Sequence, residues 1–364
     1  MYHQAYTERR SLMIRLFVTQ SGIAWKKNCL DRLLKKTWAT DSHGNRYIYG
    51  SNEIPHGCMK KKTIYEIKGL YRDSFRITGF EFGKGKKSLC IVGSMRGNEV
   101  QQLYCCSQLV KKFRQLEEEG RIRPDVKILI IPCCNPYSIN TQKRFWTIDN
   151  TDINRMFPGY DLGEATQRIA DGIFSQIKDY EYGIQFTSFY MPGEFIPHVR
   201  LMDEGYSDVI TAMKFGMPYV VKRTVRPYDT ATLNYNWQVW NTKAYSLYTS
   251  TTSRIDNISA GQAVLSILRF CKSVGFVKYQ ENGDHPSIVI SDKELISVRT
   301  AKSGIFEPLV KVGDNVDEGT PLADIINPYD GSVMETLYAP RKGTLFFMHS
   351  DPITYAETAV IKMV

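Results

Sequence analysis

Two side chains of opposite charge, Arg96 and Glu99, lie in a stretch whose pattern places them at a cleft. Residues 90–100 are typical of an apolar strand, a turn with two glycines and the first turn of an amphipathic helix. Gly93 and Gly97 permit a sharp backbone reversal, and open α/β sheets bind ligands where the carboxyl end of a strand meets a helix amino terminus. We therefore expect Arg96 and Glu99 to face a ligand-binding cleft.

This turn resembles the first metal-binding motif of the zinc carboxypeptidase superfamily, in its succinylglutamate desuccinylase/aspartoacylase branch. The family motif reads Gly-x-His-Gly-Asn/Asp-Glu, and its His and Glu are zinc ligands. Glu99 matches the Glu, whereas Arg96 stands at the position of the His. Arginine stays protonated at ordinary pH and cannot be a zinc ligand. The resemblance covers about residues 60–364.

The most specific part of the resemblance follows the next predicted strand. It consists of Asn135-Pro-Tyr-Ser, Lys143-Arg-Phe-Trp and Asp149-Asn-Thr-Asp-Ile-Asn-Arg-Met-Phe-Pro-Gly159. In the family, an Asn-Arg pair and an earlier Arg in these elements grip the substrate carboxylate, which implies this role for Arg144, Asn154 and Arg155. A guanidinium suits it because it donates two parallel charge-assisted hydrogen bonds. The alternative is that Arg144 and Arg155 pair with Asp149 and Asp152.

The other catalytic positions of the family are replaced. Its Asp-x-His-Thr motif supplies an acid and the third zinc ligand, and the matched residues here are Ile184 and Phe186. Tyr248 stands at the position of the Glu that acts as general base, and a phenol with a reference pKa near 10 is a poor base at neutral pH. His198 is expected to be a packed residue, because a zinc site needs three or four ligands. The catalytic residues are therefore unknown, and no metal or other cofactor is expected.

Two functions remain open on these grounds. The first is a degenerate relative, a pseudoenzyme that binds a small carboxylate ligand or a peptide carboxyl terminus without conventional zinc hydrolysis. The second is an active amidohydrolase or metallopeptidase that hydrolyses N-acyl amino acids or peptides with altered metal ligands or with Cys133 or Cys134 as nucleophile. Zinc is expected only under the second hypothesis. Because a nucleophilic cysteine needs a base within reach and the sequence nominates none, the pair is better explained as buried thiols.

Periodicity outlines an α/β fold. Apolar or alternating runs predict strands, and three- and four-residue spacing predicts helices. The predicted strands are 64–67, 75–82, 88–92, 126–132, 182–187, 218–222 and 244–250, and the helices begin near 100 and span 162–177, 208–215 and 258–273. Residues 228–240 are expected as a polar-aromatic connection able to cover the cleft. The strand-helix-strand order around residue 100 implies a parallel crossover.

Three domains are expected. Residues 1–58 form a basic extension or a mis-assigned start, and residues 59–280 form the carboxypeptidase-like open mixed sheet flanked by helices. Residues 290–364 resemble the barrel-sandwich half of lipoyl carriers, because short strands alternate there with glycine turns. Lys342 lies in one such turn, but its neighbours differ from those of a carrier lysine, so we expect a solvated side chain.

Composition narrows the classes of partner. The 364 residues carry a net charge of +9, but residues 1–58 hold nine Lys or Arg against four Asp or Glu, so the rest is only weakly basic and no nucleic-acid partner is expected. No apolar run approaches the length that spans a bilayer, so no membrane partner is expected. We expect a cytoplasmic location. The eight cysteines lack metal or disulfide spacing. The sequence does not indicate an oligomeric state.

Overall fold

The computed structural model describes residues 38–40, 46–48, 59–69, 73–203, 205–281, 283 and 285–364. The chain divides into two compact units, Met1–Pro55 and His56–Val364. In the first unit, strands β1 (Trp38–Thr40) and β2 (Arg46–Ile48) pair antiparallel. Apart from these two strands, the predicted extension 1–58 lies outside the described residues.

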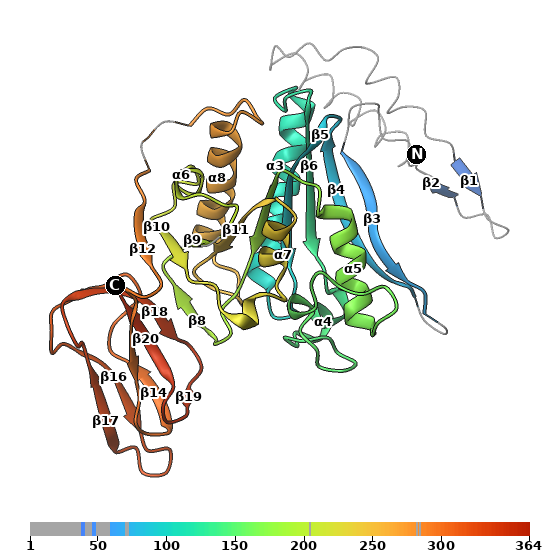
Figure 1. Cartoon of the computed structure of the whole chain (residues 1–364). Helices are drawn as coiled ribbons and strands as arrows, with labels where there is room; N and C mark the ends of the chain where they lie inside the picture. Colours follow the sequence, from blue (N-terminus) through green and yellow to red (C-terminus); the bar gives the residue numbers. More distant parts are fainter. Residues whose placement is uncertain are drawn as a thin grey trace, which may run out of the picture. The chain divides into compact units, whose positions relative to one another are not determined.

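A large mixed sheet forms the centre of the second unit (Figure 1). Within the described residues it has nine strands in the order β12-β10-β9-β11-β7-β5-β6-β4-β3. The strands are β3 (Lys60–Ile67), β4 (Phe75–Gly83), β5 (Lys86–Ser94), β6 (Val126–Cys133), β7 (Tyr182–Phe186), β9 (His198–Met202), β10 (Tyr219–Arg223), β11 (Lys243–Tyr248) and β12 (Ile288–Ser291). Parallel and antiparallel pairs both occur, for example β5 with β6 and β9 with β11. The expected open mixed sheet is confirmed.

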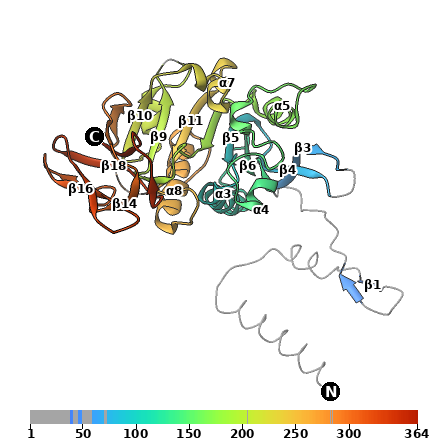
Figure 2. The same ribbon diagram turned by 90° about the horizontal axis from the view of Figure 1, so that it is seen from below.

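Helices cover both faces of this sheet (Figure 2). The helical segments are α3 (Val100–Glu118), α4 (Pro136–Thr141), η1 (Ile153–Arg155), α5 (Ala165–Ile177), α6 (Val209–Met213), η2 (Pro227–Asp229), α7 (Leu233–Val239) and α8 (Asn257–Ser273). On one face, α3 and α8 bury residues such as Phe113 and Ile267. On the other, α5 and α7 bury residues such as Ile173 and Trp237.

The predicted strand-turn-helix unit is present as β5, a short turn and α3. Every residue of β5 from Ser88 onward is buried, as expected for a strand covered on both faces. Gly120 follows the end of α3, and its φ of 67° and the hydrogen bond from its N–H to the Glu117 carbonyl form a carboxyl cap. β6 then returns parallel to β5, which confirms the predicted crossover.

The carboxyl-terminal residues form two smaller antiparallel sheets around their own core, which includes Leu322, Ile325 and Val360. The strands are β13 (Ile296–Arg299), β14 (Gly304–Pro308), β15 (Asn315–Val316), β16 (Pro321–Ile326), β17 (Val333–Tyr338), β18 (Gly343–His349), β19 (Ile353–Thr354) and β20 (Ala359–Met363). One sheet has the order β13-β20-β18-β15 and the other β17-β16-β14-β19, so no closed barrel forms among the described strands.

These smaller sheets are joined to the large one by a strand and by shared core residues. Strand β8 (Gly193–Phe195) lies between β7 and β9 in the sequence but pairs with β18. Phe346 and Phe347 of β18 pack in one cluster with Tyr219 and Val221 of β10. One side of the large sheet near β9 and β10 is therefore covered by the carboxyl-terminal part. Among the described residues, no helix is both long and apolar enough to cross a bilayer.

Candidate functional site

The turn between β5 and α3 packs directly against the segment that carries Arg144. At Gly97, an added Cβ would lie 2.2 Å from the carbonyl oxygens of Ser138 and Lys143. The Gly97 N–H donates to the Arg144 carbonyl at 3.2 Å. At Gly93, an added Cβ would lie 2.3 Å from the Pro132 carbonyl oxygen. Both glycines are therefore required by close backbone approach, and neither adopts a positive φ.

Arg96 and Glu99 form the buried ion pair at the centre of the site. The Arg96 side chain is 5% exposed and that of Glu99 is fully buried, with Nη1 and Oε1 3.1 Å apart. Arg96 also donates from Nε and Nη2 to Oδ2 of Asp152, at 3.1 and 2.8 Å. Burial lowers the pKa of Arg96, but the two facing carboxylates outweigh it and hold the pKa above its usual value.

The Glu99 carboxylate is fully occupied by hydrogen-bond donors. Oε2 accepts from the backbone N–H groups of Met95 and Arg96, at 2.7 and 3.0 Å. Oε1 accepts from the Ser188 hydroxyl at 2.6 Å, as well as from Arg96. A carboxylate held by four donors, one of them a guanidinium, has no free lone pair aimed at a cation. The charge that a metal would supply comes from Arg96.

Strand β7 places different residues at the site from those the sequence predicted. Ile184 and Phe186 are fully buried in the core beneath α3 and α8 and do not reach Glu99. Side chains alternate between the two faces of a strand, so Gln185 faces the pocket instead, and just beyond the strand Ser188 contacts Glu99. The expected position of Phe186 at the site is therefore wrong, because its side chain lies in the core, and the residue after β7 that contacts Glu99 is Ser188.

The three predicted clamp residues line one cavity of about 380 Å³. Asn154 accepts hydrogen bonds at Oδ1 from Gln185 and from the Leu233 N–H, at 3.0 and 3.4 Å, which turns its amide nitrogen toward the cavity. Arg155 donates to the Tyr228 carbonyl. Within the described part of the chain, the Arg144 guanidinium has no carboxylate partner. Burial lowers the pKa of Arg144, and the nearby Arg96 lowers it further.

The alternative in which Asp149 and Asp152 neutralise the clamp arginines is not what the described residues show. Asp152 pairs with Arg96. Asp149 accepts from the Thr151 N–H at 2.8 Å, within its own turn. Arg144 and Arg155 are thus left with charge facing the cavity.

Tyr248 also lines the cavity and is held by two neighbours from β9. The rings of His198 and Tyr248 stack with centroids 4.5 Å apart. The Arg200 guanidinium lies 4.3 Å from the Tyr248 ring centroid and donates to its hydroxyl at 2.8 Å. Burial lowers the pKa of His198 to about 3, so this ring is neutral and packed, as expected. Arg200 was not singled out from the sequence, although a charged residue inside an apolar run was the available signal.

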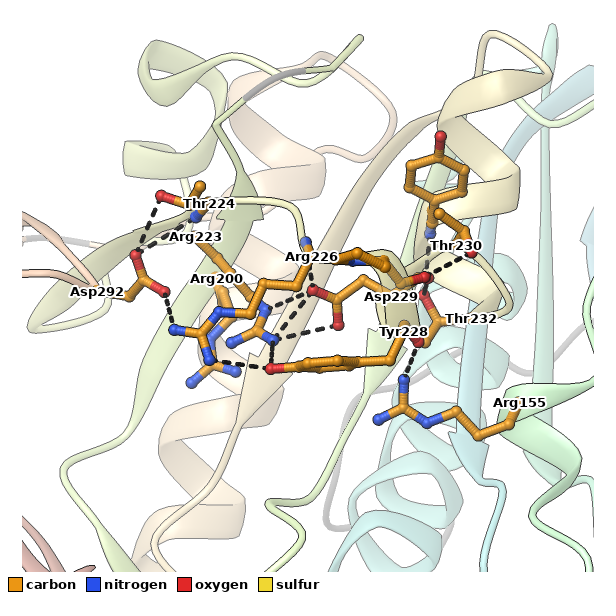
Figure 3. Close-up of polar contacts among 12 residues, drawn as sticks. Arg155, Arg200, Arg223, Thr224, Arg226, Tyr228, Asp229, Thr230, Thr232 and Asp292 are labelled. Atoms are coloured by element: carbon orange, nitrogen blue, oxygen red, sulfur yellow. Dashed lines mark hydrogen bonds and ion pairs between the residues drawn. The ribbon is translucent and has the colours of Figure 1, made fainter.

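We call the cavity that holds these groups the cationic pocket. Besides Arg96, Arg144 and Arg155, its lining includes five further cations contributed by β9, β10, β13, β20 and the loop before η2. They are Arg200, Arg223, Arg226, Arg299 and Lys362. Among the described residues, two carboxylates line it, Asp229 and Asp292, and Figure 3 shows them paired with Arg223 and Arg226. Even with Glu99 and Asp152 counted, cations exceed carboxylates by four.

A larger cavity of about 790 Å³ adjoins the cationic pocket and shares Arg144 and Phe189 with it. The carboxyl-terminal sheets line it with apolar residues such as Phe306 and Met348. Asn98, next to Glu99, also lines it, and its side-chain oxygen is buried without a hydrogen-bond partner in the described structure. Arg144 therefore lies where the two cavities meet.

Neither cysteine of the predicted pair is suited to nucleophilic attack. Burial raises the pKa of the Cys133 thiol to about 12 and that of Cys134 well above its usual range. A nucleophilic cysteine requires the thiolate, which these surroundings disfavour at neutral pH. The thiol form of the second hypothesis thus has no support from the geometry.

The residues do not fit a zinc ion at the family position. The Glu99 carboxylate already accepts four hydrogen bonds, one of them from the positively charged Arg96 guanidinium and one from the Ser188 hydroxyl. Over the described residues, no group of three or more His, Cys, Asp or Glu side chains is arranged to hold a metal. Zinc prefers imidazole, thiolate and carboxylate ligands around an open position. The two carboxylates at this site, Glu99 and Asp152, are both bonded to the Arg96 guanidinium.

Comparison with known proteins finds a family likeness in one segment of the chain. Residues 85–185, which hold the β5–α3 turn and the clamp segment, match the family model described as the succinylglutamate desuccinylase/aspartoacylase catalytic domain. The matched stretch contains all the predicted clamp residues but ends before Tyr248 and Arg200.

The similar proteins cover different shares of the chain. An N-alpha-acetyl-L-2,4-diaminobutyric acid deacetylase of Halomonas elongata is 24% identical over 123 residues, which is 34% of each chain, so the match spans about a third of that curated relative. A succinylglutamate desuccinylase structure from Silicibacter sp. TM1040 has a TM-score of 0.72 and 18% identity, covering 84% of this chain and 94% of that one. The product-bound ectoine utilization protein EutE of Ruegeria pomeroyi has a TM-score of 0.71 and 16% identity, covering 85% and 95%. At these identities the structures establish the shared fold.

Proposed function

We propose that the protein binds a small carboxylate-bearing amino-acid derivative, or the carboxyl terminus of a peptide, without conventional zinc hydrolysis. The ligand carboxylate accepts hydrogen bonds from the guanidinium groups of Arg144 and Arg155 and from the amide nitrogen of Asn154. These donors come from one segment of the chain, face one cavity and are not neutralised by the described carboxylates. Charge-assisted bonds of this kind are among the strongest that a site can offer a carboxylate.

The single observation that supports the loss of zinc chemistry is the position of Arg96. Its guanidinium bridges Glu99 and Asp152 inside the site, with the Arg96 side chain 5% exposed. Zinc hydrolysis depends on a metal that lowers the pKa of bound water and on a base that takes the proton. Here a fixed cation holds the family carboxylate, and Tyr248 hydrogen-bonds Arg200 at the position of the base.

Hydrolysis of N-acylated amino acids is the second candidate function. It is favoured by the likeness of the chain to a deacetylase over 123 residues. It would require ligands other than those that the described residues bring together. Incubating the full-length protein with N-acetyl-L-aspartate and following release of acetate by proton NMR distinguishes the two, and we expect no release above the buffer rate.

Isothermal titration calorimetry with N-acetyl-L-aspartate tests the clamp. We expect saturable binding by the wild type and a large loss of affinity in Arg155→Ala. Removing one partner of a desolvated charge pair costs about 2 to 5 kcal/mol, or roughly 30-fold to several thousand-fold in affinity. Lys342→Ala is the matched control, because Lys342 is an exposed turn residue that pairs with Asp317, and this variant should bind like the wild type. An unchanged dissociation constant in Arg155→Ala would remove the clamp.

A further inference from the structure

Arg200 carries a polar group that the described structure leaves unsatisfied. It lies on β9 with its Nη1 bonded to the Tyr248 hydroxyl, but its Nε is buried and has no hydrogen-bond partner. A buried donor without a partner is costly, and a guanidinium is costlier than a neutral group. Arg200 also has no carboxylate partner among the described residues, unlike Arg223 and Arg226 nearby. The arrangement suggests that a ligand supplies the missing acceptor.

Around Arg200 the charge is unbalanced. Arg226, Arg299 and Lys362 line the same end of the cationic pocket, and Asp292, the carboxylate at this end, lies 3.8 Å from Arg226. Burial lowers the pKa of Lys362, and repulsion from the three neighbouring arginines lowers it further. Four cations against one carboxylate leave three positive charges. Such a cluster repels itself unless an anion binds to it.

We propose that this end of the pocket binds a phosphate group of the same ligand whose carboxylate occupies the clamp. The inference rests on the proposed function, because it adds a second anionic subsite to the carboxylate site. A phosphate dianion compensates two of the three excess charges, whereas a carboxylate compensates one. Arginine forks and a lysine point charge are also the usual partners of phosphate oxygens.

Tyr228 sets the separation between the two subsites (Figure 3). Its carbonyl oxygen accepts from Arg155 at the clamp, and its hydroxyl accepts from Arg226 and Arg223, at 3.0 and 3.3 Å. Figure 3 shows Arg155 at the backbone end of Tyr228 and the guanidinium groups of Arg200 and Arg226 at its phenol end. Cations of both subsites therefore contact the same residue, Tyr228, which fits a small phosphorylated acid.

The phosphate subsite lies where the family has its general base. Tyr248 stands at that position and Arg200 covers its ring. An anion bound to Arg200 would occupy the space beside Tyr248 that a catalytic carboxylate and its water need. An anion bound in place of the general base fits a protein that binds its ligand and does not hydrolyse it.

The test compares two ligands that differ only in the phosphate. N-acetyl-L-serine and N-acetyl-O-phospho-L-serine are titrated into the full-length protein by calorimetry at one pH and one ionic strength. We expect the phosphorylated ligand to bind at least about tenfold more tightly, since hydrogen bonds to charged groups contribute about that much. Titration of inorganic phosphate alone shows whether the subsite works without a linker.

Variants assign the preference to the subsite. Arg200→Met and Lys362→Met should each bring the affinity ratio of the two ligands close to one, and Lys342→Met, a control on an exposed turn, should keep the wild-type ratio. Lys362→Met serves if Arg200→Met does not fold. Equal binding of both ligands by the wild type, or an unchanged ratio in Lys362→Met, would overturn the phosphate subsite while leaving the clamp intact. If neither ligand binds, the clamp and the subsite both fail.

Discussion

At the scale of single residues, the site depends on Arg96. The family motif has a His here that binds a metal ion together with the Glu. Arg96 instead donates a hydrogen bond to Glu99, so its guanidinium takes the place of the metal as the partner of that carboxylate. The pair is satisfied on both sides, since Glu99 receives four hydrogen bonds and Arg96 also reaches Asp152. Buried charges are tolerated only when they are paired and hydrogen-bonded in this way.

Replacing Arg96 should therefore destabilise the fold. Arg96→Met leaves Glu99 and Asp152 close together without a counter-charge, and breaking a buried ion pair costs about 3 to 5 kcal/mol. The free energy of unfolding, measured by urea titration, should fall by that amount. Arg123→Met is the control, because the Arg123–Asp125 pair is exposed on both sides and should contribute little. If both substitutions lowered the free energy of unfolding equally, the buried Arg96 pair would stabilise the fold no more than an exposed pair does.

The sequence predicted part of this residue-scale picture. The turn was expected to place Arg96 at a ligand-binding cleft, and Arg96 lines the cationic pocket. Arg200 and Ser188 escaped prediction because their roles depend on strand neighbours distant in sequence: Arg200 meets Tyr248 across the β9–β11 pair, and Ser188 meets Glu99 of the next strand-turn unit. Phe186 was placed at the site by motif alignment, and the alternation of side chains along β7 puts it in the core instead.

At the scale of elements, strong local patterns predicted the structure well and weak ones did not. The buried run of β5, the amphipathic α3 and the crossover to β6 were all predicted. Strands β8 and β9 were missed because β8 is only three residues long and β9 mixes His198 and Arg200 into its apolar residues. Residues 228–240 contain η2 and α7, and Trp237 of α7 is fully buried, so this segment forms a wall of the site and is not a loose cover.

The close approach at Gly97 gives a prediction about elements. Gly97→Ala would push a methyl group into two carbonyl oxygens of the segment that carries Arg144. That segment must shift, so we expect a lower free energy of unfolding and weaker binding of N-acetyl-L-aspartate. Thermal unfolding and calorimetry measure the two effects.

Gly261→Ala is the matched control for this change. Gly261 lies in α8, and an added Cβ would meet nothing within 4 Å. Alanine is favoured over glycine in a helix by about 1 kcal/mol, so this variant should be as stable as the wild type or more so. Wild-type stability and ligand affinity in Gly97→Ala would contradict the close packing of the turn.

At the scale of the whole second unit, the carboxyl-terminal sheets complete the site. They supply Arg299 and Lys362 to the cationic pocket and cover β9 with Phe346. His198 is enclosed at this junction, stacked on Tyr248 and 4.9 Å from the Phe346 ring centroid. Its Nδ1–H donates to the Ile196 carbonyl, whereas its Nε2 is buried without a partner in the described structure.

The buried His198 predicts loss of stability in acid. Above about pH 6.5 the ring is neutral in the native and the unfolded chain. Below it the unfolded chain takes up a proton that the native ring, with a pKa of about 3, does not. Because the unfolded state then binds more protons, this group removes up to about 1.4 kcal/mol of stability per pH unit as the pH falls toward 3. In His198→Phe, the slope of the unfolding free energy between pH 6 and pH 4 should be flatter than in the wild type. Identical slopes would show that the ring is not held neutral.

The zinc content of the protein shows whether Arg96 stands in place of a metal ion beside Glu99. The full-length chain is incubated with one equivalent of zinc, passed through gel filtration and analysed by plasma mass spectrometry, beside a Glu99→Gln variant. Because Arg96 holds Glu99, we expect far less than one zinc per chain and no difference between the two proteins. One zinc per chain in the wild type, lost in Glu99→Gln, would contradict this expectation and would establish the metal-dependent hydrolase.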